Sequence, residues 1–201
     1  MPDLLTITLN PALDLSSAVD RVVPGPKLRL DQPVAEPGGG GINVARAARA
    51  LGGAPRALAV LGGLAGARIA ALLAGEGVDL AQVAIPGETR QNLAVTDRLT
   101  GEMYRLQVPG PLWDPARTEA LLVRIEAETR AIGPGAVVVL SGSQPPGLAA
   151  GFPQALVRRL AGARVLIDTS GEALHHLLRA PAPGAAPWVL RMDQVESEGL
   201  A

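Results

Sequence analysis

The sequence predicts an α/β protein with a mostly parallel central sheet flanked by helices. Short apolar, β-rich runs alternate along the chain with longer segments whose apolar residues recur at helical spacing. Such alternation implies right-handed crossover connections, which leave strands parallel and cover both faces of the sheet. The composition agrees, because 48% hydrophobic and 18% charged residues in a chain of 201 residues allow one well-buried domain, 1–201.

The elements follow one another in a regular order. The predicted strands are 4–9, 56–63, 136–142, 164–170 and 188–192. The predicted helices are 42–51, 66–77, 114–132, 150–162 and 170–180. The third helix has a good start, because Asp114 can cap its first turn and Pro115 suits the first helical position.

Two stretches, about 14–37 and 88–110, break this alternation. Their residues look like alternating strands, and "LTGE" at 99–102 predicts a hairpin turn in the second stretch. Antiparallel strands have no place in a doubly wound parallel sheet. These two stretches therefore predict a small antiparallel β flap beside the main sheet.

The composition also excludes several classes of function. A net charge of −1 leaves no basic excess for a general nucleic-acid binder, and the absence of cysteine excludes disulfides and thiolate chemistry. The start of the chain carries Asp3 and no basic segment, so it is not typical of a signal peptide. Its apolar runs are shorter than the roughly 20 residues of a membrane span. We expect a cytoplasmic protein without nucleic-acid or membrane partners.

Four consecutive glycines, 38–41, open the predicted helix at 42–51. Backbone amides at such a turn form an anion site, since unpaired N–H groups and the helix dipole point the same way. The run lacks the Gly-Lys-Ser/Thr ending of a Walker loop, and Asn43 replaces the third glycine of a dinucleotide fingerprint. NAD binding is therefore disfavoured. A turn packed closely against a neighbouring element is an equal alternative to anion binding.

Polar side chains also follow the predicted strands and occupy the flap. Asp14, Ser143 and Asp168 lie at or just past strand ends, where open α/β sheets bind ligands. Arg90 and Arg105 lie on the two strands of the second flap segment, where guanidinium groups can bind phosphate oxygens in pairs. The alternatives are a cap or turn for Asp14, a turn for Ser143 and solvated edge charges for the arginines.

Lysine is rare in this sequence. Lys27 is the only lysine among 18 basic residues, which favours a role for it where arginine cannot serve. A solvated charge that happened to persist is the plain alternative.

Six motifs read together resemble the ribokinase-like PfkB family of sugar kinases. The motifs are NPALD, EPGGGGINVARAARALGG, TRQNL, GEMYRLQVPGP, LSGSQPPG and IDTSGEAL, in register from near residue 4 to about 196. The pattern is most similar to bacterial family members that phosphorylate fructose 6-phosphate. Kinases of fructose 1-phosphate and tagatose 6-phosphate share much of it.

The resemblance implies ATP-dependent, Mg²⁺-assisted phosphorylation of fructose 6-phosphate to fructose 1,6-bisphosphate, a step of glycolysis. It also implies that the flap is a lid over the substrate and an interface between the two chains of a homodimer. The implied substrate-binding residues are Asp14, Lys27, Gly38, Gly39, Asn43, Arg90, Arg105 and Ser143. Arg191 is the implied nucleotide-binding residue, and Asp168, Asp193 and Glu196 are the implied metal ligands.

The chain departs from the family pattern at two places. The family's Lys-Pro-Asn-x-x-Glu reads "RMDQVE" here, so that Arg191, Met192 and Asp193 replace the first three residues while Glu196 remains. The Gly-Ala-Gly-Asp motif that carries the family's aspartate base has no counterpart in the sequence. The resemblance thus implies a C-terminally truncated kinase, lacking the base and the adenine pocket, with little turnover alone. A non-catalytic sugar-phosphate-binding module is the alternative.

Overall fold

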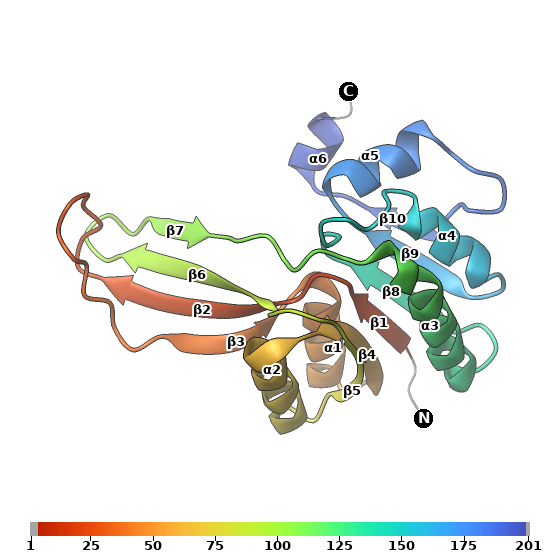
Figure 1. The fold of residues 1–201 in the computed structure, drawn as a ribbon, viewed down its shortest axis with the longest axis horizontal. Helices are drawn as coiled ribbons and strands as arrows, with labels where there is room; N and C mark the ends of the chain where they lie inside the picture. The colour runs from red at the N-terminus through yellow and green to blue at the C-terminus, as the bar shows by residue number, and fades with distance from the viewer. Residues whose placement is uncertain (1–3, 200–201) are drawn as a thin grey trace.

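Two β-sheets organise the computed structural model, which describes residues 4–199 (Figure 1). In this part of the chain the main sheet has the strand order β10-β9-β8-β1-β4-β5, with all neighbours parallel. Its strands are β1 (Leu4–Thr8), β4 (Pro55–Leu61), β5 (Asp79–Ala84), β8 (Val137–Ser141), β9 (Arg164–Asp168) and β10 (Val189–Arg191). The parallel sheet and its five predicted strands are confirmed, and β5 is an additional edge strand. Asp3, which bears on the signal-peptide expectation, lies outside the described residues.

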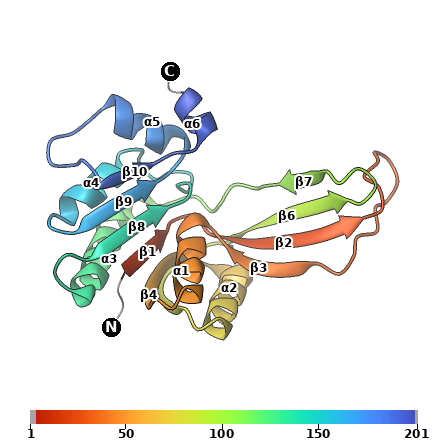
Figure 2. The same cartoon turned by 180° about the vertical axis from the view of Figure 1, so that it is seen from behind.

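Helices cover both faces of the main sheet (Figures 1 and 2). Along β4, Ala57, Ala59 and Leu61 are buried against α1 and α2, whereas Leu58 and Val60 belong to the core formed with α3 and α4. This alternation follows from the two-residue period of a strand. The helices are α1 (Gly40–Ala50), α2 (Gly63–Gly75), α3 (Thr118–Ile132), α4 (Phe152–Arg159), α5 (Gly171–Arg179) and α6 (Gln194–Glu198), with a short 3₁₀ helix, η1 (Pro115–Arg117), before α3.

The capping signal at Asp114 is confirmed, since its carboxylate accepts the Ala116 backbone N–H at 3.0 Å. The element that it caps is η1, and α3 follows directly. Within residues 4–199 we find no helix with both the length and the apolar character needed to cross a membrane.

The flap stretches form a second sheet, here called the small sheet, that projects beside the main one (Figure 1). Its strand order is β3-β2-β6-β7, where β2 and β6 are parallel and the two outer pairs are antiparallel. The expectation of a purely antiparallel flap was wrong, because the chain makes two full α/β crossovers between β2 and β6 and returns in the same direction. The strands are β2 (Ala12–Val19), β3 (Val34–Gly38), β6 (Arg90–Asp97) and β7 (Met103–Leu106).

The two turns of the small sheet differ. The hairpin predicted at 99–102 is confirmed, since the Asp97 N–H donates to the Glu102 carbonyl at 2.9 Å. The segment 20–33, which lies inside the stretch 14–37 that was expected to form strands, is instead a loop at the far end of the small sheet (Figure 1). Lys27 lies in this loop and is exposed.

The small sheet has one polar and one apolar face. On the polar face, Glu36, Asp14 and Asn92 form one cross-strand row, and Ser16, Ala94 and Arg105 form the next. On the apolar face, Leu15 is aligned with Leu93 and Leu106, and Val95 with Tyr104. Because side chains alternate along a strand, the register of the four strands fixes which residues share a face.

Candidate functional site

The glycine run brings the first turn of α1 against the ends of β1 and β8. Gly39 has a φ of 122°, a value that favours glycine. A Cβ at Gly40 would lie 2.7 Å from the Ser141 carbonyl carbon, and one at Gly41 would lie 2.7 Å from that of Ile7. Both approaches are to backbone, which no side-chain rotation can relieve. The close-packed turn is thus present in the structure, and anion binding by its amides stays a prediction.

Asp14 lies at the junction between this turn and the small sheet. Its Oδ1 accepts a hydrogen bond from Asn92 Nδ2 at 2.8 Å, and its carboxylate covers the bare Cα of Gly38, where a Cβ would lie 2.5 Å from Cγ. A polar cavity of about 110 Å³ is lined by Asp14, Asn92 and Arg105 together with Glu36. Asn92 was not predicted, although its place two residues after Arg90 on the same strand puts both side chains on one face.

Arg90, at the start of β6, carries a charge that the surrounding protein does not neutralise. Its Nη2 donates to the Asn10 carbonyl at 3.1 Å and its Nη1 to the Val108 carbonyl at 3.4 Å. Its buried Nε has no hydrogen-bond partner among the residues that the structure describes. Among residues 4–199 no carboxylate lies within salt-bridge distance of this guanidinium. Burial lowers the pKa of Arg90 from its ordinary value, and the nearby charge of Asp14 opposes that shift only in part.

Ser143 reaches the same region from the loop after β8. The side chain of Asn10 donates from Nδ2 to Ser143 Oγ at 3.1 Å and to the Gln144 carbonyl at 3.3 Å. Asn10 lies two residues after the end of β1, so the segment after one central strand is tied to the loop after the neighbouring strand, β8. Sequence reasoning did not select Asn10, although it belongs to the NPALD motif.

The carboxyl ends of β8, β9 and β10 carry a second polar group. Ser141 Oγ donates to Asp168 Oδ2 at 2.8 Å, and Arg191 Nη1 binds Asp168 Oδ1 at 3.1 Å. The hydrogen bond to Asp168 raises the pKa of Arg191. Both oxygens of Asp168 therefore have protein partners.

The two remaining predicted metal ligands cap α6. Asp193 Oδ1 accepts the Glu196 N–H, and Glu196 Oε2 accepts the Asp193 N–H, each at 2.8 Å. This arrangement is a capping box. The Asp-x-x-Glu spacing is a signal for a helix start, which the sequence carries at Asp193 and Glu196. Throughout residues 4–199, no three His, Cys, Asp or Glu side chains are grouped to hold a metal ion. Asp168, Asp193 and Glu196 all bind other groups of the protein in the structure, and their role as magnesium ligands stays a prediction from the resemblance.

The structure brings some predicted residues together and separates others. Asp14 and Arg105 line one cavity, and the Arg90 guanidinium is close enough to Asp14 for its pKa to respond. Lys27 is exposed in the loop 20–33, away from that cavity, and Asn43 is exposed on the first turn of α1. The roles of Lys27 and Asn43 stay predictions.

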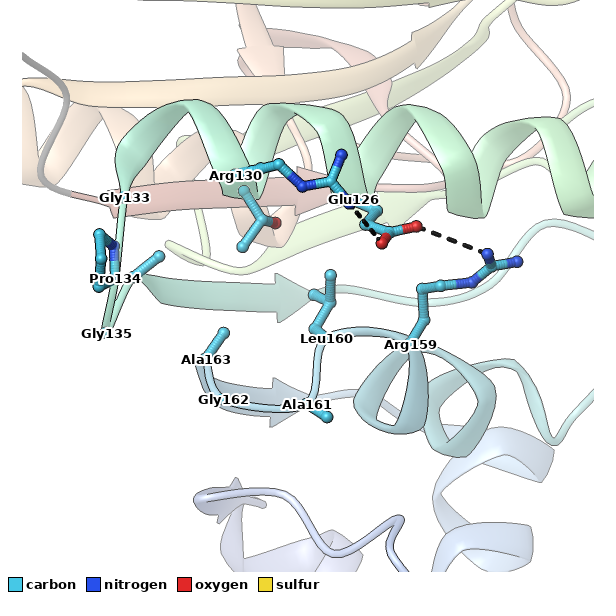
Figure 3. Close-up of a pocket in the computed structure, with 12 residues that line it drawn as sticks. Glu126, Arg130, Gly133, Pro134, Gly135, Arg159, Leu160, Ala161, Gly162 and Ala163 are labelled. Atoms are coloured by element: carbon cyan, nitrogen blue, oxygen red, sulfur yellow. Dashed lines mark hydrogen bonds and ion pairs between the residues drawn. The ribbon is translucent and has the colours of Figure 1, made fainter.

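A larger cavity, of about 480 Å³, lies at the amino-terminal ends of β8 and β9 (Figure 3). The loops that lead from α3 into β8 and from α4 into β9 line it. Its charged side chains already bind one another: Arg130 Nη2 is 2.7 Å from Glu126 Oε1, and Arg159 pairs with Glu126 and Glu119. This cavity shares no residue with the Asp14 cavity.

Comparisons with known proteins identify the family of the chain. Residues 7–183 match the protein family described as "pfkB family carbohydrate kinase". ATP-dependent 6-phosphofructokinase isozyme 2 of Mycobacterium tuberculosis is 40% identical over 178 residues, covering 88% of this chain and 52% of the relative. The 1-phosphofructokinase of Xanthomonas campestris is 36% identical over 197 residues, covering 96% of this chain and 60% of the relative.

A solved structure extends this likeness to three dimensions. The structure of phosphofructokinase-2 from Escherichia coli in complex with fructose 6-phosphate has a TM-score of 0.86 and 37% sequence identity. All of this chain is covered, together with 64% of that one. The chain thus spans between about half and two thirds of the length of these relatives. With a family description that matches most of its residues and a fold of the same class, the chain belongs to the PfkB family of carbohydrate kinases.

Proposed function

We propose that this chain is the sugar-phosphate-binding part of an ATP-dependent sugar-phosphate kinase whose substrate is fructose 6-phosphate. The observation that supports this proposal best is the half-buried guanidinium of Arg90, which has no salt-bridge partner among the described residues. A charge removed from water without an opposite charge costs free energy. A phosphate anion offsets that cost and offers oxygens for the unpartnered N–H group.

The other residues of the polar face suit the remainder of such a ligand. The Asp14 carboxylate can accept hydrogen bonds from sugar hydroxyls, and its bond from Asn92 Nδ2 holds it in place. Arg105 lines the same cavity and offers a second guanidinium to the ligand. These groups bind and orient the sugar, which is the protein's main contribution to phosphoryl transfer. Among the described residues no three His, Cys, Asp or Glu side chains are grouped to hold Mg²⁺, so the ligands of the ion stay a prediction from the resemblance.

The choice of fructose 6-phosphate rests on the names of the relatives and on the motif pattern. The higher of the two identities is to a 6-phosphofructokinase, and the solved relative binds fructose 6-phosphate. The Xanthomonas relative is a 1-phosphofructokinase, which favours fructose 1-phosphate as a second candidate. Tagatose 6-phosphate and a purely non-catalytic binding role are the remaining alternatives.

Isothermal titration of residues 1–201 with fructose 6-phosphate tests this function. We expect saturable binding that is at least about tenfold tighter than binding of fructose 1-phosphate or tagatose 6-phosphate, equivalent to about 1.4 kcal/mol. Inorganic phosphate serves as the control for simple anion binding. A coupled assay with ATP then separates the alternatives, since binding without turnover favours the non-catalytic module. Equal affinity for fructose 6-phosphate and inorganic phosphate would contradict the proposal.

We also propose that the apolar face of the small sheet mediates self-association. An apolar cavity of about 410 Å³ lies on this face. The loop 20–33 lines it with Val22, Leu28 and Leu30, and the strands β6 and β7 line it with Leu93, Val95, Tyr104 and Leu106. Exposed apolar patches of this kind mark interaction surfaces. A second copy is the occupant that the family resemblance implies.

Replacing Leu106 with glutamate is expected to convert a dimer to a monomer. Leu106 is 56% exposed, so the change leaves the fold intact while it places a charge on the apolar face. Sedimentation velocity measures the outcome, with Leu51→Glu as the control, because Leu51 is 89% exposed at the end of α1 and remote from this face. A monomeric wild-type chain, or a variant that dimerises as well as the wild type, would count against the proposed interface.

A further inference from the structure

We propose that Asn10 is a positioning residue that holds Arg90 and the loop after β8 in the geometry that binds the sugar phosphate. This inference rests on the proposed function. Asn10 is 7% exposed and lies two residues after the end of β1, a central strand of the main sheet. The side chain of Asn10 need not contact the ligand in this role.

The contacts of Asn10 reach three separate segments. Its backbone carbonyl accepts the hydrogen bond from Arg90 Nη2 at 3.1 Å, which fixes one end of the guanidinium. Its side-chain Nδ2 donates to Ser143 Oγ at 3.1 Å and to the Gln144 carbonyl at 3.3 Å. Arg90 and Ser143, both implied by the resemblance as substrate-binding residues, are therefore held by one residue.

The segment before η1 closes over the same carboxamide. Gly110 has its Cα so near to Asn10 that an added Cβ would clash with Oδ1 and lie 3.1 Å from Cγ. Val108, two residues earlier, accepts the second hydrogen bond of Arg90. Asn10 Oδ1 is buried and has no hydrogen-bond partner within residues 4–199, so the carboxamide is held by hydrogen bonds through Nδ2 and by packing at Oδ1.

This arrangement predicts that the N–H donors of Asn10, rather than its volume, are what the site needs. Asn10→Asp keeps the shape of the side chain, but a carboxylate cannot donate to Ser143 or to the Gln144 carbonyl. The charged groups that face this position are Arg90, on the Asn10 carbonyl, and Asp14, which interacts with Arg90.

The test compares the affinity for fructose 6-phosphate of Asn10→Asp, Asn10→Ala and the wild type at pH 8. We expect Asn10→Asp to bind about tenfold more weakly than the wild type, the effect of losing about one hydrogen bond. Asn10→Ala, which also lacks the N–H donors, should show a similar deficit. An affinity of Asn10→Asp equal to that of the wild type would overturn the inference, because it would show that the shape of the side chain suffices.

Hydrogen exchange measured by mass spectrometry gives a readout that needs no ligand. In Asn10→Asp and Asn10→Ala at pH 8, the segments 107–111 and 143–147 should exchange faster than in the wild type. If Asn10→Asp does not fold, Gly110→Ala disturbs the same carboxamide from the opposite side and should also speed exchange at 143–147. Unchanged exchange in these segments would refute the role of Asn10. Failure of the wild type to bind fructose 6-phosphate refutes the proposed function instead, and the exchange data still decide whether Asn10 holds these loops.

Discussion

Replacing Gly41 with alanine is expected to lower the free energy of unfolding by about 3 kcal/mol, at the upper end of the range for overpacked sites. The added methyl group would lie 2.7 Å from the Ile7 carbonyl carbon and 2.6 Å from Thr8 Oγ1. Because the Ile7 atoms belong to the backbone of a central strand, α1 must move away from β1 to make room. Thermal unfolding followed by circular dichroism should show a melting temperature lower by about 6–12 °C.

Gly75→Ala is the matched control for this experiment. Gly75 also lies in a helix, the last turn of α2, but an added Cβ meets nothing within 4 Å. Alanine there should leave stability unchanged or raise it by up to about 1 kcal/mol, because alanine is the better helix former. Equal melting temperatures for Gly41→Ala and Gly75→Ala would show that the contact between α1 and β1 is not tight.

The second large effect is expected at Arg90. Arg90→Gln should weaken the binding of fructose 6-phosphate by about 100-fold or more, which corresponds to the loss of a charge-assisted hydrogen bond worth about 3 kcal/mol. The same change should leave the melting temperature of the unliganded protein unaltered or higher. The reason is that the guanidinium is half buried and has no salt bridge among the described residues, so that its removal ends a desolvation cost.

The pair of measurements distinguishes a binding role from a structural one. A guanidinium that served only to stabilise the fold would lower the melting temperature when removed and would leave the affinity largely intact. Arg68→Gln supplies the control for the change in net charge, since Arg68 is exposed on α2. Normal binding by Arg90→Gln would show that Arg90 does not contact the phosphate.

Much of the fold could be predicted because its signals are local. The strands of the main sheet are continuous apolar runs and the helices have apolar residues at helical spacing, so each element was recognisable from its own residues. β5 was missed because it is an edge strand with half-exposed residues, which carries only a weak apolar signal. α6 was missed because its Asp-x-x-Glu start, at Asp193, was interpreted as a pair of metal ligands.

The site was harder to predict, since it depends on pairing between distant segments. The positions of Asp14, Arg90 and Arg105 follow from strand order and register, which single-chain patterns do not reveal. The parallel pairing of β2 and β6 could not be read from the alternation of either strand. The role of Asn10 likewise appears only when the loop after β8 is placed beside it. The rarity of lysine in the composition suggested a role for Lys27. It did not predict that Lys27 lies in the exposed loop 20–33.

The parallel pairing of β2 with β6 has a consequence for how the protein folds. Asp14 and its hydrogen-bond partner Asn92 are 78 residues apart, and α1, β4, α2 and β5 all lie between them. Closing so long a stretch of chain is entropically unfavourable until the intervening elements have packed against the main sheet. During synthesis, β6 must therefore leave the ribosome before β2 gains its central neighbour, and the polar face assembles only after the first half of the chain is available.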